Sequence, residues 1–253
     1  LYLMTEYERC YRNRGVICGV DEAGRGPLAG PVVAAAVILP EKFELFYLND
    51  SKKLSEKKRE LLFTQIKEQA VCYAVGIVDE KRIDEINILQ ATFLAMERAY
   101  EGLYLKLQEF CKLNNNKFIE PDIIVDGNFV PNIKNCSSIK ALVKADDSVY
   151  EVMAASILAK TARDKMMIRY SWIYPEYGYE KHKGYGTKAH IEAIKKYGKL
   201  WYIIYEHETI KDINKNSEMA IRRMELIGQK YEAGGKISYK SRMKHSVTFE
   251  KMR

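Results

Sequence analysis

The sequence predicts an α/β domain built on a mixed sheet. Two short apolar segments, 16–20 and 32–39, have the length and composition of buried strands and are joined by a glycine-rich turn. Residues 71–78 form a third apolar run of strand length. Helical and strand patterns alternate after this point, which is typical of α/β architectures.

The individual elements follow from periodicity and from capping signals. The predicted strands are 16–20, 32–39, 71–78, 122–125 and 137–143. The predicted helices are 55–69, 83–111, 149–170, 187–197 and 217–231. Ser55 and Thr187 are suitable N-caps, and Gly198 ends the helix that Thr187 begins. The helix 149–170 is rich in alanine and serine, so it can pack closely against a sheet.

The composition excludes several classes of protein. With 47% hydrophobic and 30% charged residues, the chain can bury a core, and no apolar stretch is long enough to cross a membrane. Five scattered cysteines without CxxC spacing indicate reduced thiols and argue against a zinc site. The first 14 residues lack the apolar core of a signal peptide. We therefore expect a cytoplasmic, monomeric protein with no membrane partner.

Positive charge is concentrated at the C-terminal end. The net charge is +7, and residues 211–253 contain eleven Lys and Arg against five Asp and Glu. A basic tail favours polyanions such as nucleic acid, although a solvated lysine-rich surface explains the same composition. We therefore predict a main domain at 1–210 and a helical, basic extension at 211–253.

Four carboxylates are expected where strands end or a helix begins. Asp21 and Glu22 end the first strand, Asp126 ends the fourth, and Asp146 or Asp147 precedes the small-residue helix. The ends of strands in an α/β sheet are where ligands usually bind. Converging carboxylates repel one another, and hard divalent cations remove that penalty. Oxygen-only ligands select Mg²⁺ or Mn²⁺ over zinc, and two such ions can support phosphodiester cleavage.

Each acid also has an ordinary structural explanation. Asp126 lies in a common turn signal, and Asp146 with Asp147 can cap a helix. Neighbouring residues of a strand face opposite sides of the sheet. Asp21 and Glu22 can therefore share a site only if the chain already turns at Glu22.

The turn after the first acid pair suits a phosphate ligand. Gly24 and Gly26 flank Arg25, so no side chain beside it blocks the approach of a ligand to the main chain. Arg25 itself can bind a phosphate through two hydrogen bonds.

At this level of detail the chain resembles the ribonuclease HII family, the type 2 ribonucleases H, over about residues 15–200. The motifs that carry the resemblance, in matching order and spacing, are 19–31, 49–55, 126–127, 144–146, 154–160 with 163–164, and 181–187 with His190. The resemblance implies an RNase H-like fold, cleavage of RNA in RNA–DNA hybrids, and cutting at single ribonucleotides embedded in duplex DNA. The segment 200–207 departs from the family pattern, which leaves the usual C-terminal contacts open.

The resemblance also implies the roles of the acids. Asp21, Glu22, Asp126 and Asp146 match the four metal-binding carboxylates of the family. The family uses two Mg²⁺ or Mn²⁺ ions and leaves 5′-phosphate and 3′-OH ends. Asp146 is preferred to Asp147 because it follows the lysine and the small residue of its motif.

Substrate contacts are implied in the same way. The turn Gly24-Arg25-Gly26 matches the segment that recognises the ribose 2′-OH, the group that distinguishes RNA from DNA. Tyr185 matches the tyrosine that packs on the sugar at an RNA–DNA junction. Three lysines are expected to contact phosphates without reading the base sequence: Lys52, Lys53 and Lys183.

Two other interpretations stay open. One is a ribonuclease HIII-like enzyme, which cuts hybrids without junction specificity. The other is a non-catalytic hybrid-binding protein. The Gly-Arg-Gly-Pro turn and the presence of all four acids favour ribonuclease HII.

Overall fold

The computed structural model describes residues 15–40 and 54–197, and these form two compact units. The first unit contains the described residues up to Gly26 and those of Gly30–Arg163. The second contains Pro27–Ala29 and the described residues from Asp164 onward. Several predictions lie outside the described residues: those for Lys52, Lys53, the segment 200–207, the helix 217–231 and the basic extension 211–253.

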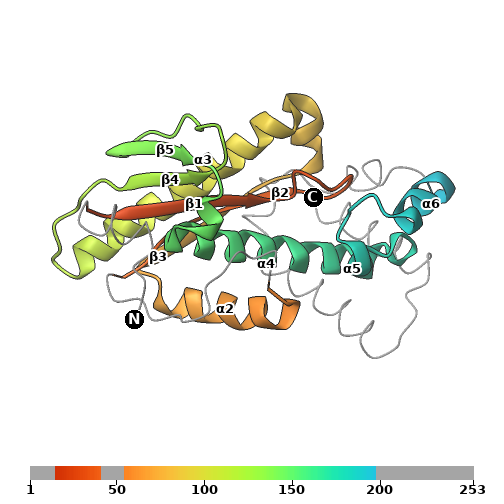
Figure 1. Ribbon diagram of the computed structural model, residues 1–253, viewed down its shortest axis with the longest axis horizontal. Helices are drawn as coiled ribbons and strands as arrows, with labels where there is room; N and C mark the ends of the chain where they lie inside the picture. The colour runs from red at the N-terminus through yellow and green to blue at the C-terminus, as the bar shows by residue number, and fades with distance from the viewer. Residues whose placement is uncertain (1–14, 41–53, 198–253) are drawn as a thin grey trace, which may run out of the picture. The chain divides into compact units, whose positions relative to one another are not determined.

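A mixed five-stranded sheet forms the centre of the first unit, which confirms the predicted fold class (Figure 1). In spatial order its strands are β3 (Cys72–Val78), β2 (Val32–Ile38), β1 (Ile17–Ala23), β4 (Asp122–Asp126) and β5 (Ser138–Leu142). β2 runs antiparallel to β1 and β3, whereas β4 runs parallel to β1 and to β5. The C-terminal ends of β1 and β4 therefore meet at one edge of the sheet, where α/β folds usually hold ligands.

One face of the sheet packs against α3 (Glu80–Leu113). Val20 of β1 and Val125 of β4 lie in this core. Gly76 of β3 permits a close contact with the helix, because a Cβ there would lie 2.0 Å from the carbonyl oxygen of Ala95. The strands thus present one set of alternating side chains to α3.

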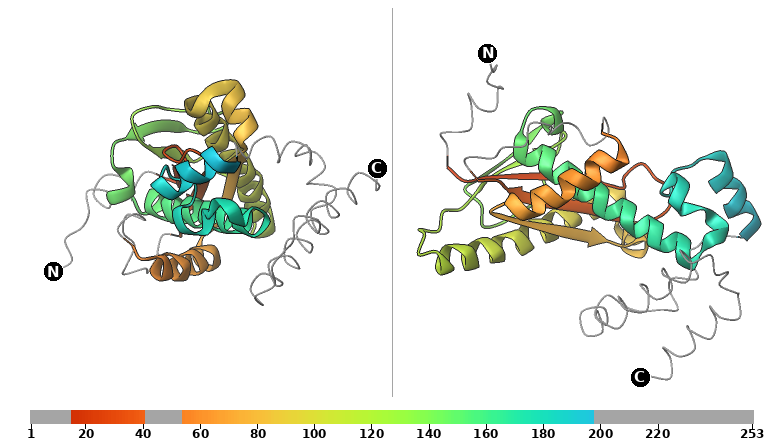
Figure 2. Two further views of the ribbon diagram at one scale, coloured as in Figure 1. Left: turned by 90° about the vertical axis from the view of Figure 1, so that its right-hand side faces the viewer. Right: turned by 90° about the horizontal axis from the view of Figure 1, so that it is seen from below.

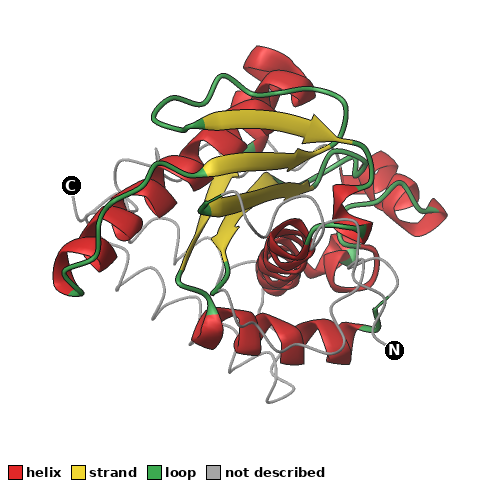
Figure 3. Ribbon diagram, turned by 60° about the vertical axis from the view of Figure 1, so that its left-hand side comes forward, coloured by secondary structure: helices red, strands yellow, loops and turns green. Residues whose placement is uncertain are grey.

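The opposite face is covered by α2 (Glu56–Gln69) and by the first part of α4 (Tyr150–Ile173) (Figures 2 and 3). Ile66 of α2 and the alanines of α4 share a core with β2, as the small residues of this helix predict. Gly19 of β1 lets the first turn of α4 come close, since a Cβ there would lie 2.1 Å from the carbonyl carbon of Glu151.

The second unit contains short helices and a small aromatic core. Its helices after α4 are η2 (Pro175–Tyr177), α5 (Tyr179–His182) and α6 (Lys188–Tyr197). The buried residues of its core are Met167, Tyr177, Tyr179 and Ala193. The backbone amides of Leu28 and Ala29 both donate to the carbonyl oxygen of Gly184, at 2.9 and 3.3 Å. These bonds attach the segment 27–29 to the loop before α6.

The predicted strands and the helices within the described residues are present, with differences at their ends. β1 runs to Ala23 rather than ending at residue 20, because Glu22 still pairs with Ala34 of β2. α3 begins earlier than predicted because Asp79 caps it, and Asn87 interrupts its helical backbone with a φ of 67°. Both predicted N-caps are confirmed: Ser55 and Thr187. Within the described ranges, no helix has the length and apolar character needed to cross a membrane.

Candidate active site

Two of the predicted acids come from adjacent parallel strands. Val20 of β1 is in register with Val125 of β4, so Asp21 and Asp126 follow one step further along each strand. Val20 and Val125 face α3, and side chains alternate along a strand. Asp21 and Asp126 therefore face the opposite side of the sheet, which α4 covers.

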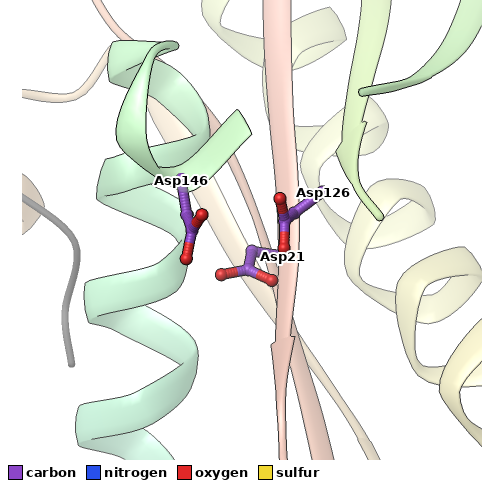
Figure 4. A group of neighbouring side chains, drawn as sticks. All are labelled: Asp21, Asp126 and Asp146. Atoms are coloured by element: carbon purple, nitrogen blue, oxygen red, sulfur yellow. The ribbon is translucent and has the colours of Figure 1, made fainter. Parts of the chain in front are cut away.

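The third acid reaches the same place through a short turn, η1 (Ala145–Asp147), which precedes α4. The backbone amide of Ala145 donates a 2.8 Å hydrogen bond to Oδ1 of Asp126. One carboxylate oxygen from each of Asp21, Asp126 and Asp146 lies within 4.8 Å of the other two (Figure 4). We call these three residues the acid cluster.

Only one of the two adjacent acids of η1 joins the acid cluster. Asp146 is 4% exposed, whereas Asp147 is exposed to solvent. The close approach of α4 to β1 at Gly19 explains how a residue just before the helix comes near Asp21. The geometry thus agrees with the choice of Asp146 made from the motif.

The pKa of Asp21 is raised well above its ordinary value. Burial is the main cause, followed by the negative charges of Glu22 and Asp126. A hydrogen bond from the Ser156 hydroxyl and one from the Glu22 amide oppose the rise. The carboxylates therefore repel one another, and a divalent cation among them would remove that repulsion. A donor set made only of carboxylate oxygens fits Mg²⁺ or Mn²⁺ and does not resemble a zinc site.

Glu22 lies beside the acid cluster without being part of it. The strand continues through Glu22, and the oxygens that lie within 4.8 Å of one another belong to Asp21, Asp126 and Asp146. Oε1 of Glu22 forms an ion pair with Nη1 of Arg25 at 3.3 Å. The backbone amide of Glu22 donates a 2.7 Å hydrogen bond to Oδ1 of Asp21. Its charge is nonetheless close enough to raise the pKa of Asp21.

Gly24 opens the turn after β1 with a φ of +118°, a backbone conformation that other residues rarely adopt. A Cβ at this position would lie 2.5 Å from the carbonyl oxygen of Pro31 and 2.7 Å from Nε of Arg163. Arg163 is 1% exposed, and its Nε donates a 2.9 Å hydrogen bond to the Pro31 carbonyl. A buried guanidinium therefore supports the turn from within the first unit.

The other two residues of the turn face solvent. Arg25 has a side chain that is 48% exposed, and Gly26 is also exposed. Arg25 is thus accessible to a phosphate while it pairs with Glu22, and a phosphate can compete for the same guanidinium.

Two of the predicted substrate contacts belong to the second unit. Tyr185 is 47% exposed, so a large part of its ring is accessible. Lys183 has a left-handed backbone with a φ of 50°, and its Nζ donates to the carbonyl oxygen of Glu180. The ammonium of Lys183 is therefore engaged within its own loop.

Two residues that support the site were not selected from the sequence. Ser156 bonds to Asp21, and Arg163 supports the turn at Gly24. Both lie on α4 and are seven residues apart, which places them on one face of the helix two turns from each other. Both positions lie within the motif 154–160 with 163–164, and this motif was the signal available in the sequence.

The sequence matches the family model of ribonuclease HII over residues 18–208. Ribonuclease HII of Treponema denticola is 80% identical over 181 residues, which cover 71% of this chain and 91% of that protein. Ribonuclease HII of Endomicrobium trichonymphae is 54% identical over 195 residues, covering 76% of this chain and 86% of the relative.

The fold of this chain is also similar to those of solved ribonuclease H structures. The crystal structure of ribonuclease H2 from Pyrococcus horikoshii aligns with a TM-score of 0.54 at 30% identity, covering 73% of this chain and 90% of that one. A crystal structure of Bst-RNase HIII in complex with Mn²⁺ aligns with a TM-score of 0.56, covering 72% of this chain and 63% of that one. Its identity is 22%, so it supports the fold alone.

Proposed function

The chain belongs to the ribonuclease HII family, and from this premise we propose that it cuts both RNA–DNA hybrids and single ribonucleotides embedded in duplex DNA. Membership of the family supports endonuclease activity on RNA–DNA hybrids and dependence on a divalent metal. The proposed cut lies 5′ of the ribonucleotide and leaves 5′-phosphate and 3′-OH ends. The observation that carries the proposal is the acid cluster, in which three carboxylates from distant parts of the sequence converge.

The acid cluster would hold the metal. Asp21, Asp126 and Asp146 offer converging oxygens, and Glu22, the next residue on β1, is proposed as the fourth metal-binding acid of the predicted set. When bound, divalent cations activate water and stabilise the charge that develops on the scissile phosphate. No histidine or cysteine nucleophile is required for this chemistry.

The glycine-rich turn would identify the ribonucleotide. Gly24 and Gly26 leave the main chain around Arg25 open, so its polar groups can reach a 2′-OH, which both donates and accepts. Arg25 can exchange its pairing with Glu22 for a phosphate oxygen. We propose that this turn selects ribose over deoxyribose, and that the acids act on the phosphate next to it.

Tyr185 would pack on the sugar at the RNA–DNA junction. Its exposed ring can pack against a sugar, and this contact depends on the correct placement of a single nucleotide. Lys183, and with it Lys52 and Lys53, would contact phosphates without reading sequence. For Lys183 this requires releasing the carbonyl of Glu180.

One assay with two substrates tests the proposal. A labelled DNA duplex with one embedded ribonucleotide and a duplex with a complete RNA strand are each incubated with the protein and Mg²⁺. We expect cleavage of both, with the embedded site cut on its 5′ side. Cleavage of the RNA strand alone would instead favour a ribonuclease HIII-like activity, and binding without cleavage would favour a hybrid-binding protein.

The adjacent acids of η1 provide a matched pair of variants for this assay. Asp146→Asn removes a charge from the acid cluster, whereas Asp147→Asn removes the same charge from an exposed position one residue away. We expect the first variant to lose cleavage of both substrates and the second to retain it. Equal activity of the two variants would contradict the assignment of Asp146.

A further inference from the structure

Two histidines of the second unit form a stacked pair behind Tyr185. The rings of His182 and His190 have centroids 4.5 Å apart and planes inclined by 18°. Tyr179 meets both rings edge-on, with centroids at 5.8 and 5.4 Å. His190 is fully buried, although histidine is a residue that usually keeps some contact with water.

The hydrogen bonds of His182 define its uncharged form. Its Nδ1 accepts a 3.2 Å hydrogen bond from the backbone amide of Gly184 and therefore carries no proton. Its Nε2 lies 2.8 Å from the carbonyl oxygen of Tyr177, which can only accept, so Nε2 carries the proton. His182 thus bridges two backbone groups as a neutral ring.

His190 is also neutral, but it carries its proton on Nδ1 and not on Nε2. Its Nδ1 lies 2.9 Å from the carbonyl oxygen of Tyr185 and must donate to it. Its Nε2 is buried, with no hydrogen-bond partner among the described residues. A proton on Nε2 would therefore be a buried donor without an acceptor, which is costly. Burial also lowers the pKa of His190 below its ordinary value, which likewise favours the neutral ring.

The two histidines hold the backbone of Tyr185 from both sides. The Tyr185 amide donates to the carbonyl oxygen of His182 at 2.9 Å, and the Tyr185 carbonyl accepts from the ring of His190. That carbonyl also accepts from the amide of Thr187 at 2.8 Å, but this bond spans only two residues and moves with the loop. The bond from His190 is the one that joins the Tyr185 carbonyl to a side chain of α6.

The loop before Tyr185 has little conformational freedom of its own. Lys183 and Gly184 have φ values of 50° and 87°, and a Cβ on Gly184 would lie 2.2 Å from the carbonyl oxygen of Ala29. The direction of the backbone at Tyr185 is therefore fixed by the left-handed residues Lys183 and Gly184 before it and by the hydrogen bond from His190 to its carbonyl. Tyr185 itself remains 47% exposed.

We propose that His190 is a positioning residue for Tyr185: its buried Nδ1–H fixes the Tyr185 carbonyl and thereby the direction in which the exposed ring projects. The inference rests on the proposed function, in which Tyr185 packs on the sugar at an RNA–DNA junction. His190 itself touches no substrate in this scheme. Its effect is therefore confined to substrates that use Tyr185.

The test compares two substitutions of His190. His190→Leu removes the donor, whereas His190→Asn places an amide NH₂ close to the former Nδ1 and can keep the bond to the Tyr185 carbonyl. kcat and KM are measured on the embedded-ribonucleotide duplex and on the complete hybrid. We expect His190→Leu to lower kcat/KM about tenfold more on the embedded site than on the hybrid, a typical cost of losing one positioning hydrogen bond. His190→Asn should restore most of this difference.

A double-mutant cycle separates positioning from general damage. If His190 acts through Tyr185, combining His190→Leu with Tyr185→Ala should give no further loss of selectivity beyond Tyr185→Ala alone. Ala193→Gly on α6 weakens the same unit through helix propensity and serves as the control, with no expected change in the substrate ratio. If His190→Leu does not fold, His190→Gln replaces it, because the amide of glutamine lies one methylene further out and does not reproduce the Nδ1 position.

The outcomes distinguish this inference from the function on which it rests. Equal losses on both substrates, or additive effects with Tyr185→Ala, would overturn the positioning role while leaving the nuclease assignment intact. Failure of the unaltered protein to cut the embedded site would overturn the proposed junction activity instead. Rescue by His190→Asn together with a non-additive cycle would support the positioning role.

Discussion

The backbone amide of Ala145 donates a hydrogen bond to Oδ1 of Asp126 across 19 residues of sequence, at 2.8 Å. This bond joins the end of β4 to the turn that carries Asp146. One carboxylate oxygen of Asp126 is thereby occupied with the backbone, which fixes the orientation of the side chain toward Asp21. The fold thus holds the acid cluster together, although its charges repel.

Loss of a single charge in the acid cluster should abolish cleavage. We expect Asp21→Asn and Asp126→Asn each to lower kcat by at least about a hundredfold, the scale observed when one electrostatic group of an active site is removed. Asparagine can still accept the Ala145 amide, so the fold at position 126 is retained. Hybrid affinity, measured by fluorescence anisotropy without metal, should survive. Cleavage at the normal rate by either variant in Mg²⁺ would contradict the assignment.

Divalent metal should stabilise the folded protein. Because a cation relieves the repulsion among the acids, we expect Mg²⁺ at ten times its Kd to raise the melting temperature by about 3–6 °C. Asp126→Asn should raise the melting temperature in metal-free buffer and reduce the gain from Mg²⁺. Asp147→Asn is the control, because that carboxylate is exposed and outside the cluster. An equal gain from Mg²⁺ in all three proteins would mean that the ion binds elsewhere.

Gly24→Ala should lower the free energy of unfolding for two reasons, and a second variant distinguishes them. The φ of +118° strains any side chain, and the added Cβ would also meet Pro31 and the buried Arg163. Gly127 has the same φ of +118° but nothing within 4 Å of an added Cβ. We expect Gly127→Ala to lose about 1–3 kcal/mol of unfolding free energy from strain alone, and Gly24→Ala to lose more. Urea denaturation measures both, and equal losses would show that the contact with Arg163 is easily relaxed.

Tyr185→Ala should affect the embedded ribonucleotide most. Removing the ring should lower kcat/KM on that substrate roughly tenfold, the scale of an aromatic contact worth about 1–1.5 kcal/mol. The complete hybrid, which offers many equivalent positions for cleavage, should be cut almost normally. Tyr185→Phe keeps the ring and should behave like the unaltered protein. An equal loss on both substrates would argue against a junction role for Tyr185.

The buried His190 should make stability depend on pH. Its pKa in the folded protein lies below the ordinary value of 6.5, so the unfolded chain binds more protons between these two values. The unfolding free energy should therefore be fully retained above pH 6.5 and decrease as the pH falls toward the lowered pKa. Urea denaturation at several pH values, compared with His190→Asn, isolates this contribution. The unaltered protein should show the steeper decrease, and identical slopes would exclude His190 as the source.

The fold class was predictable because its signals are local. Apolar runs of strand length, a small-residue helix and the caps Ser55 and Thr187 depend on neighbouring residues, and the structure has these elements where they are expected. The short helices η1, η2 and α5 escaped prediction because one helical turn is too short to produce a periodic pattern. The end of β1 was missed because the pairing of Glu22 with Ala34 is a contact between strands.

By itself the sequence predicted which residues carry the chemistry: the acids, the glycine-rich turn and Tyr185 occur in an ordered set of motifs whose residue types suit metal, ribose and phosphate. Only the tertiary structure decided how they are arranged. Parallel pairing of β1 and β4 brought Asp21 beside Asp126, and the approach of α4 at Gly19 brought in Asp146. The sequence placed Arg163 and His190 within motifs of the family but did not show what they contact, because burial and hydrogen bonding depend on segments far apart in the chain.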